Sequence, residues 1–335
     1  MGRQDAVWRE KMIPSFVRGS IAPVFTAFHE DGRLDDDGQR AILNYLDESG
    51  EVSACFVRSG MGQMFTFSFE DVKQIAKVSC EHLTGRTPVL VGTAGIWDRD
   101  RSKRPDPNVY LEQAVELSRY AESVGASGVV HTIPEAILPG PGETIPGVIL
   151  RYFERICSAV KIPVFIYQSP GTDENYCLSP ELACQLADMP LIMGMKASTV
   201  DAAYIFDITY AVRGKDFGFI SGNECGFLAG LVTGSRAVIG QGATMNPRIL
   251  NAIQIRYEKG DIEGAMAAQH STNILVRRSL NSTEFFKRYI SEKGYPIKPY
   301  ARRTGANLYT SPKPELSQSD YDAFKVLYES ELAKY

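Results

Sequence analysis

Two residues near the middle of the chain could together carry out covalent chemistry on a carbonyl compound. Lys196 ends the apolar part of LIMGMKAST, and Tyr167 lies at the end of the run PVFIYQSP. An apolar setting disfavours the charged form of a lysine, which leaves more neutral amine to attack a carbonyl carbon and form a Schiff base. A neighbouring phenol can supply and remove the protons that such a reaction moves. The alternatives are structural: a lysine whose ammonium group reaches water or a salt bridge, and a tyrosine that packs at a strand end.

The elements that would position these residues are predicted by eight short apolar runs. Each run has a nearly continuous hydrophobic centre, which is typical of parallel strands covered on both faces. Segments with helical periodicity lie between the runs, and eight alternating strand and helix units predict a (β/α)8 TIM barrel. A doubly wound sheet is less favoured, because no Gly-x-Gly-x-x-Gly motif follows the first run. The runs cover residues 20–28, 52–60, 87–95, 127–134, 163–170, 191–198, 217–224 and 237–244.

Three regions are predicted along the chain. Residues 1–18 form an N-terminal extension, residues 19–250 form the catalytic barrel, and residues 251–335 form a C-terminal helical domain. Beyond Pro247 the pattern is helical without strand-like runs, and a segment with one glycine and two prolines precedes the last helix.

Composition excludes several classes of protein. The net charge of −4 shows no basic excess of the kind that nucleic acids or anionic membranes attract. None of the six cysteines forms a C-x-x-C pair, and no apolar run is long enough to cross a membrane. We therefore expect a cytoplasmic protein without a nucleic-acid or membrane partner. The four histidines (His29, His82, His131 and His270) lie on different predicted elements, so no metal site is expected.

The active site of a TIM barrel lies at the carboxyl ends of its strands. The residues that end the runs are therefore the candidates for chemistry. The charged segment DRDRSKRPDP, at residues 98–107 after the third run, is expected to be a solvated loop and not a lid over the site.

Several motifs are similar to those of the dihydrodipicolinate synthase and N-acetylneuraminate lyase family of class I aldolases. They are YQSPGT, GMKAST, GSIAPVFTAFHEDGRLD, SGMGQMFTFSFEDV, ISGNE and GDIEGA, and the resemblance extends from about residue 18 to about residue 300. It implies a barrel with a C-terminal helical domain, a homo-oligomer (tetramer or dimer), and no metal or organic cofactor. It also implies that Lys196 forms a Schiff base with pyruvate or another 2-oxo acid, that Tyr167 transfers protons, and that an aldehyde is the second reactant.

The sequence departs from the family pattern at three places. The two hydroxyl residues of the loop after the second strand are replaced by Gly60 and Met61, although backbone N–H groups there could still bind a carboxylate. Thr172 stands where the synthase has an arginine, and Glu135 follows Pro134 where the family has a tyrosine. Dihydrodipicolinate synthase activity is therefore not expected.

The predicted function is that of a lyase acting on a 2-oxo acid through Lys196, by aldol cleavage or condensation or by dehydration of a 2-oxo sugar acid. A non-catalytic or regulatory protein that only binds the 2-oxo acid is the alternative. Polar residues near other strand ends, namely His131, Glu224 and Thr244, could add contacts to sugar hydroxyls. The predicted substrate-binding residues are Ser59, Gly60, Met61, Gly62, Glu135, Gln168, Thr172, Ser198, Gly222 and Asn223.

Overall fold

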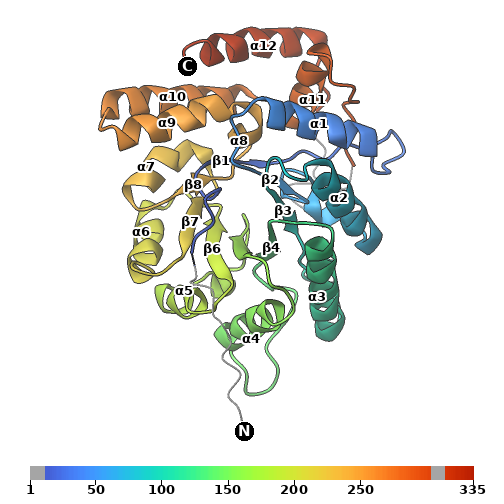
Figure 1. The fold of residues 1–335 in the computed structure, drawn as a ribbon, viewed down its shortest axis with the longest axis vertical. Coiled ribbons are helices and arrows are strands. Elements are labelled where there is room, and N and C mark those ends of the chain that lie inside the picture. Colours follow the sequence, from blue (N-terminus) through green and yellow to red (C-terminus); the bar gives the residue numbers. More distant parts are fainter. Residues whose placement is uncertain (1–11, 303–313) are drawn as a thin grey trace.

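Eight parallel strands close into a barrel in the order β1 to β8. The computed structural model describes residues 12–302 and 314–335. Helices surround the strands on the outside (Figure 1), so the predicted (β/α)8 TIM barrel is confirmed. The strands are β1 (Gly19–Pro23), β2 (Ala54–Val57), β3 (Val89–Gly92), β4 (Gly128–Thr132), β5 (Val164–Gln168), β6 (Ile192–Ala197), β7 (Gly218–Ser221) and β8 (Ala237–Val238).

The strands are apolar throughout because both of their faces are covered. Phe56, Phe165 and Ile220 belong to the cluster that fills the barrel interior, whereas the neighbouring Ile166 and Phe219 belong to the larger cluster beneath the helices. Successive side chains of a strand point to opposite faces, so each strand contributes to both clusters in turn. This alternation also decides which strand-end residues can reach the mouth of the barrel.

The helices begin where short polar side chains cap their free N–H groups. Ser68 and Asp71 form a reciprocal capping box at α2, and Asp35 accepts from the N–H of Gly38 at α1. The outer helices are α1 (Asp36–Glu48), α2 (Phe69–His82), α3 (Pro107–Ser123), α4 (Ile145–Cys157), α5 (Pro180–Ala187), α6 (Ala202–Ala211), α7 (Phe227–Val232) and α8 (Gly242–Met245). Short 3-10 helices follow three strands: η1 (Met64–Thr66), η2 (Glu174–Tyr176) and η3 (Glu224–Gly226).

Segments before and after the barrel pack against it. Val17 is buried in the interior cluster, and the ring of Phe16 lies 6.1 Å from that of Phe165, so residues 12–18 close the amino-terminal end of the barrel. The expected domain boundary at residue 250 lies inside α9, which packs on β1 and α7. Figure 1 shows α11 beside α1 with α12 above it, and α9 and α10 next to α7 and α8. These C-terminal helices are α9 (Pro247–Glu258), α10 (Ile262–Arg278), α11 (Ser282–Glu292) and α12 (Gln318–Leu332).

No helix in the described ranges is long and apolar enough to cross a membrane.

One fully buried lysine lies in the interface between α11 and the barrel. Lys287 donates hydrogen bonds to the carbonyl oxygens of Thr26 and Tyr300, and burial lowers its pKa to about 7. The unfolded chain therefore holds a proton between pH 7 and 10.5 that the folded chain has lost, so this lysine makes folding stability rise with pH in that window.

We expect the stability of the wild type, relative to a Lys287→Met variant, to rise by about 2 kcal/mol between pH 7 and pH 9. Urea denaturation of both proteins at these two pH values and equal ionic strength measures the difference. Lys298→Met, at an exposed position, is the control and should keep the wild-type pH dependence. Parallel pH dependence of Lys287→Met and wild type would contradict the assignment.

Candidate active site

Lys196 and Tyr167 lie side by side at the carboxyl end of the barrel. Their Cα atoms are register partners on β6 and β5, and the Nζ atom of Lys196 lies 4.1 Å from the centroid of the Tyr167 ring. Lys196 is 6% exposed and Tyr167 is 1% exposed. The amine thus sits over an aromatic face in an almost water-free environment, within reach of a phenol that can exchange protons with a bound substrate.

A buried carboxyl group faces the same part of the barrel. Glu224, the first residue of η3 after β7, accepts a hydrogen bond from the N–H of Gly242 at 3.1 Å. Burial raises the pKa of Glu224, and the charge of Lys196 opposes that rise. Because burial favours the protonated form, this carboxyl group can donate a hydrogen bond or a proton as well as accept one.

The loop after β2 is folded tightly around Ser59. The Oγ atom of Ser59 accepts from the N–H of Gly62 at 3.0 Å, so this hydroxyl serves the loop itself. A Cβ atom at Gly62 would lie 2.7 Å from the carbonyl oxygen of Val24, so only glycine fits there. The N–H groups of Gly60 and Met61 donate to no acceptor in the described part of the chain. These N–H groups are open to a carboxylate, and the expectation that they bind one stays a prediction.

The C-terminal part of the chain holds this loop in place. The amide of Gln63 donates to the carbonyl oxygen of Arg302 at 2.6 Å and accepts from the N–H of Arg302 at 3.1 Å. The guanidinium of Arg302 pairs with Asp71 on α2 at 2.8 Å. The segment that follows α11 is thus bonded directly to the loop expected to hold the substrate carboxylate.

Three predicted residues lie after β6 and β7. A Cβ atom at Gly222 would lie 2.5 Å from the carbonyl oxygen of Ala197, so this glycine allows the two strand ends to approach. Asn223 accepts from the N–H of Cys225 at 3.0 Å and caps η3. Ser198 is half-buried directly after β6, two residues beyond Lys196. Ser198 is the one of the three that carries a hydroxyl group.

Two predicted residues on β5 and its loop use their polar atoms within the protein. The Oε1 atom of Gln168 accepts from the N–H of Leu178 at 3.0 Å and from the hydroxyl of Tyr204 on α6 at 2.9 Å. Thr172 donates to the carbonyl oxygen of Ser169 at 2.8 Å. Gln168 follows Tyr167 on the strand and so points to the helix layer, while Tyr167 points inward.

His131 likewise lies on the outer side of the sheet. Its ring nitrogens are 2.9 Å from the hydroxyls of Thr93 and Tyr152, and burial lowers its pKa to about 3. The ring is therefore neutral and holds α4 against β3 and β4. Thr244 donates to the carbonyl oxygen of Pro23 at 3.0 Å and is also fully buried, so neither residue faces the mouth.

The loop after β3 is the largest departure from expectation. Arg99 and Arg101 both pair with Glu135, each at 2.8 Å from one of its two carboxylate oxygens. The N–H of Asp173 adds a third hydrogen bond to this carboxylate at 2.9 Å. The loops after β3, β4 and β5 are thus tied together over the barrel. The prediction of a solvated loop holds for the exposed Lys103 but is wrong for Arg99, because a buried carboxylate draws that side chain inward.

Another buried charge lies beneath that loop. Arg58, directly after β2, is 2% exposed and donates to the carbonyl oxygens of Gly92, Ala94 and Gly95. Its Nε atom has no hydrogen-bond partner among the described residues, and burial lowers the pKa of its guanidinium to about 10. A buried cation held only by carbonyl groups costs free energy, which makes this position a functional candidate.

The sequence comparison gives one family. A model of the dihydrodipicolinate synthetase family matches residues 16–319. The chain belongs to the dihydrodipicolinate synthetase family. The resemblance and the prediction of a lyase, aldolase-type enzyme are thereby confirmed, because members of this family are enzymes of that type.

Relatives in the family have different activities. A putative 2-dehydro-3-deoxy-D-gluconate aldolase, YagE of Escherichia coli, is 28% identical over 306 residues, which cover 89% of this chain and 94% of the relative. A 4-hydroxy-tetrahydrodipicolinate synthase of Nitrosospira multiformis is 28% identical over 252 residues, covering 75% and 77%.

Solved structures of the family share the fold. The crystal structure of YagE in complex with pyruvate superposes with a TM-score of 0.75 at 24% identity, covering 93% of this chain and 98% of that one. N-acetylneuraminate lyase from Mycoplasma synoviae gives a TM-score of 0.73 at 21% identity, covering 96% and 99%. At these identities the superpositions support the barrel and its C-terminal helices, not a substrate.

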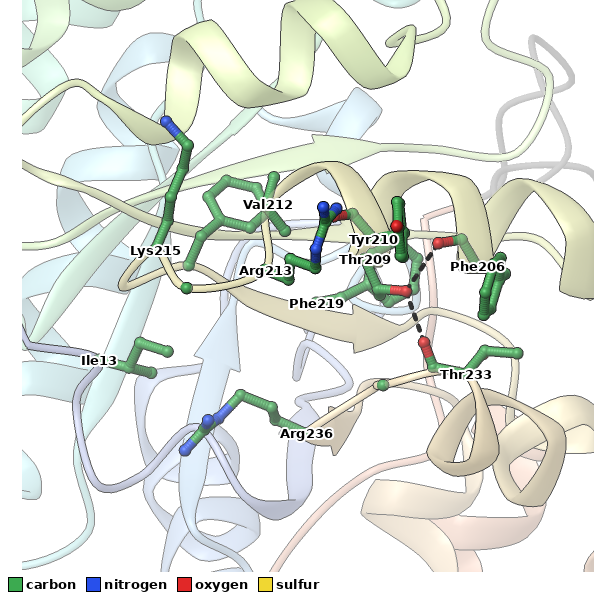
Figure 2. Close-up of a pocket in the computed structure, with 13 residues that line it drawn as sticks. Ile13, Phe206, Thr209, Tyr210, Val212, Arg213, Lys215, Phe219, Thr233 and Arg236 are labelled. Atoms are coloured by element: carbon green, nitrogen blue, oxygen red, sulfur yellow. Dashed lines mark hydrogen bonds between the residues drawn. The ribbon is translucent and has the colours of Figure 1, made fainter.

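A hollow lies at the amino-terminal end of the barrel, opposite the end that holds Lys196. Its volume is about 330 Å³, and Figure 2 shows Tyr210, Arg213 and Arg236 on its wall. These residues precede β7 and β8, so they lie at the amino ends of the strands, away from Lys196. The active site of a TIM barrel is built at the other end, so this hollow is not part of it.

Sequence reasoning missed Arg58 and Arg99. The alternation of charges in DRDR, next to Trp97 and directly after a strand, was the available signal for Arg99. No pattern marks Arg58, which lies one residue beyond β2. In the described ranges no three histidine, cysteine, aspartate or glutamate side chains group together so that they could hold a metal ion.

Proposed function

We propose that the protein is a class I lyase that forms a Schiff base between Lys196 and pyruvate, or another 2-oxo acid, and makes or breaks a carbon–carbon bond next to it. The contact between the Lys196 amine and the Tyr167 ring, at 4.1 Å in a buried barrel mouth, is the observation that carries the proposal. YagE, a relative over most of the chain, has been crystallised with pyruvate. That supports pyruvate as the 2-oxo acid.

The chemistry begins with attack of the neutral Lys196 amine on the keto carbon. The carbinolamine loses water to give a protonated imine. Tyr167 passes protons in these steps and takes the proton that then leaves the adjacent carbon. Loss of a proton from the adjacent carbon gives an enamine, which attacks the carbonyl carbon of an aldehyde and forms the new bond. Water then hydrolyses the imine, releases the product and restores the amine.

The same enamine can instead expel a hydroxyl group from the next carbon of a 2-oxo sugar acid. The departing hydroxyl needs a proton, and Glu224 is the candidate donor because it is buried near enough to Lys196 to feel its charge and because burial favours its protonated form. We propose a sugar-acid type of substrate and not that of dihydrodipicolinate synthase. Thr172, which replaces the synthase arginine, bonds within its own loop and offers no charge to a second carboxylate.

We also propose that the protein is a homo-oligomer, a dimer or a tetramer, in the cytoplasm. Phe206 and Tyr210 on α6 stack at 5.9 Å and are 52% and 55% exposed, and Val232 at the end of α7 is 65% exposed. An apolar surface of this kind is the sort that a second copy covers.

Trapping with borohydride tests the proposal directly. The protein is incubated with pyruvate and sodium borohydride, and any added mass is located by peptide mapping. A reduced pyruvate adduct on Lys196 is the expected result. If neither pyruvate nor a series of longer 2-oxo acids gives an adduct on Lys196, the Schiff-base function is wrong.

A further inference from the structure

The mouth of the barrel holds more buried positive charge than its carboxylate neutralises. Arg99 and Arg101 share the single carboxylate of Glu135, and Arg58 bonds only to carbonyl oxygens. Farther out on the rim, Asp173 lies near both Arg101 and Arg104 and offsets one further charge. Two buried guanidinium groups, those of Arg58 and Arg99, therefore line the same cavity as one buried carboxylate, and the half-exposed Arg101 also pairs with that carboxylate. This imbalance favours a second anion.

A small cavity lies between these groups. Its lining includes Arg58, Arg99, Tyr110, Thr132 and Glu135, and its free volume is about 10 Å³. That is room for one water-sized group. The cavity adjoins the catalytic pair, because the Cα atom of Thr132 is the register partner of that of Tyr167.

The backbone around the cavity is strained. Arg58, Gln63 and Arg99 have φ angles of 47°, 62° and 67°, and they are the non-glycine residues with positive φ in the described ranges. Arg58 and Arg99 line the cavity, and Gln63 precedes Met64, which also lines it. Strained backbone of this kind persists where surrounding contacts enforce it, and it concentrates at ligand sites.

Arg99 is held in position from three sides. It donates to Glu135 and, at 2.8 Å, to the carbonyl oxygen of Pro170, and its guanidinium lies 5.3 Å from the centroid of the Phe65 ring. These contacts fix the orientation of the Arg99 guanidinium group before any ligand binds. An incoming anion would meet an ordered guanidinium group without first having to order it.

We infer that this cavity is a subsite for a carboxylate at the end of the substrate remote from the imine carbon. One carboxylate oxygen fills the enclosed space and gives the Nε–H of Arg58 an acceptor, and the added negative charge is shared by Arg58 and Arg99. A sugar hydroxyl could fill the same space but would leave the charge imbalance unchanged. The inference rests on the proposed function, since imine formation at Lys196 is what places the far end of the substrate.

A matched pair of 2-oxo acids tests the subsite. 2-Oxoglutarate and 5-methyl-2-oxohexanoate have the same length and differ in whether the remote group carries two oxygens or two methyl groups; 2-oxoadipate and its matched dimethyl analogue extend the chain by one carbon. The concentration that gives half-maximal borohydride-trapped adduct is measured for each. In the wild type we expect at least one dicarboxylate to need about tenfold less than its neutral partner, as for a charge-assisted hydrogen bond.

The variants locate the preference in the cavity. Arg99→Ala and Arg58→Met should each reduce the ratio between the partners to about one, and Arg99→Ala keeps the test valid if the buried Arg58→Met variant fails to fold. Arg236→Ala, which removes an exposed arginine at the opposite end of the barrel, should keep the wild-type ratio. Ratios below twofold in the wild type, or an undiminished ratio in Arg99→Ala, would overturn the subsite. If the subsite fails in this way but the wild type still gives a pyruvate adduct, the Schiff-base function stands. If the wild type gives no adduct at all, the Schiff-base function is wrong.

Discussion

Lys196→Ala is expected to abolish the exchange of pyruvate methyl protons with solvent deuterium, a loss of about 10³-fold or more. The exchange requires the imine, because only the protonated imine acidifies the adjacent carbon enough for its proton to leave. Lys196 is the buried amine at the mouth that can form it. Proton NMR of pyruvate in D2O measures the rate without knowledge of the aldehyde partner.

Two controls separate loss of the amine from loss of the fold. Lys196→Arg keeps a positive charge but cannot form an imine, so it should be as inactive as Lys196→Ala. Lys161→Ala, at an exposed position before β5, should exchange at the wild-type rate. Exchange by Lys196→Ala at more than about a tenth of the wild-type rate would show that another group carries the chemistry.

Tyr167→Phe is expected to separate the two halves of the reaction. The ring remains, and with it the aromatic face that lies 4.1 Å from the Lys196 amine, but the hydroxyl that moves protons is gone. Adduct trapping with pyruvate and borohydride should therefore survive at longer times, while proton exchange falls by about 10²- to 10⁴-fold. Both quantities are measured on one preparation, by mass spectrometry and NMR.

Tyr176→Phe is the matched control for removal of a buried hydroxyl. Tyr176 donates to the carbonyl oxygen of Ile137 at 2.7 Å, away from Lys196, so its loss should leave exchange unchanged. Equal exchange rates in Tyr167→Phe and wild type would remove Tyr167 from the mechanism. A complete loss of adduct in Tyr167→Phe would show that imine formation cannot proceed without this hydroxyl.

The strands and the catalytic pair could be predicted from the sequence because local patterns determine them. All eight apolar runs overlap a strand, and the runs that include Tyr167 and Lys196 lie side by side as β5 and β6. The runs did not predict the exact residue at which each strand ends. The first run extends to residue 28, whereas β1 ends at Pro23 and the chain continues as a loop.

The direction of individual side chains was harder to predict because the exact start and end of each strand decide which face a residue is on. Neighbouring residues of a strand point to opposite faces, so Tyr167 faces inward while Gln168 bonds to Tyr204 on α6. Candidate site residues chosen because they lie near strand ends therefore include residues of both the inner and the outer face of the sheet. His131 is another residue of the outer face, where it holds α4 against the sheet.

The arginine cluster could not be predicted because its contacts join loops far apart in the sequence. Arg99 bonds to Glu135 and Pro170, which reach it only because the folded barrel brings the loops after β3, β4 and β5 together. The local charge pattern alone is equally typical of a solvated loop. Such pairs follow from tertiary structure alone.

The bonds between Gln63 and Arg302 change how the chain can be divided. In a modular enzyme, a terminal helical region can be exchanged or removed while the catalytic unit keeps its shape. Here the segment after α11 acts as a brace on the loop expected to bind the substrate carboxylate. A transplant of this active site into another barrel would therefore have to carry that segment with it, although in sequence it lies farther from the loop than any strand of the barrel.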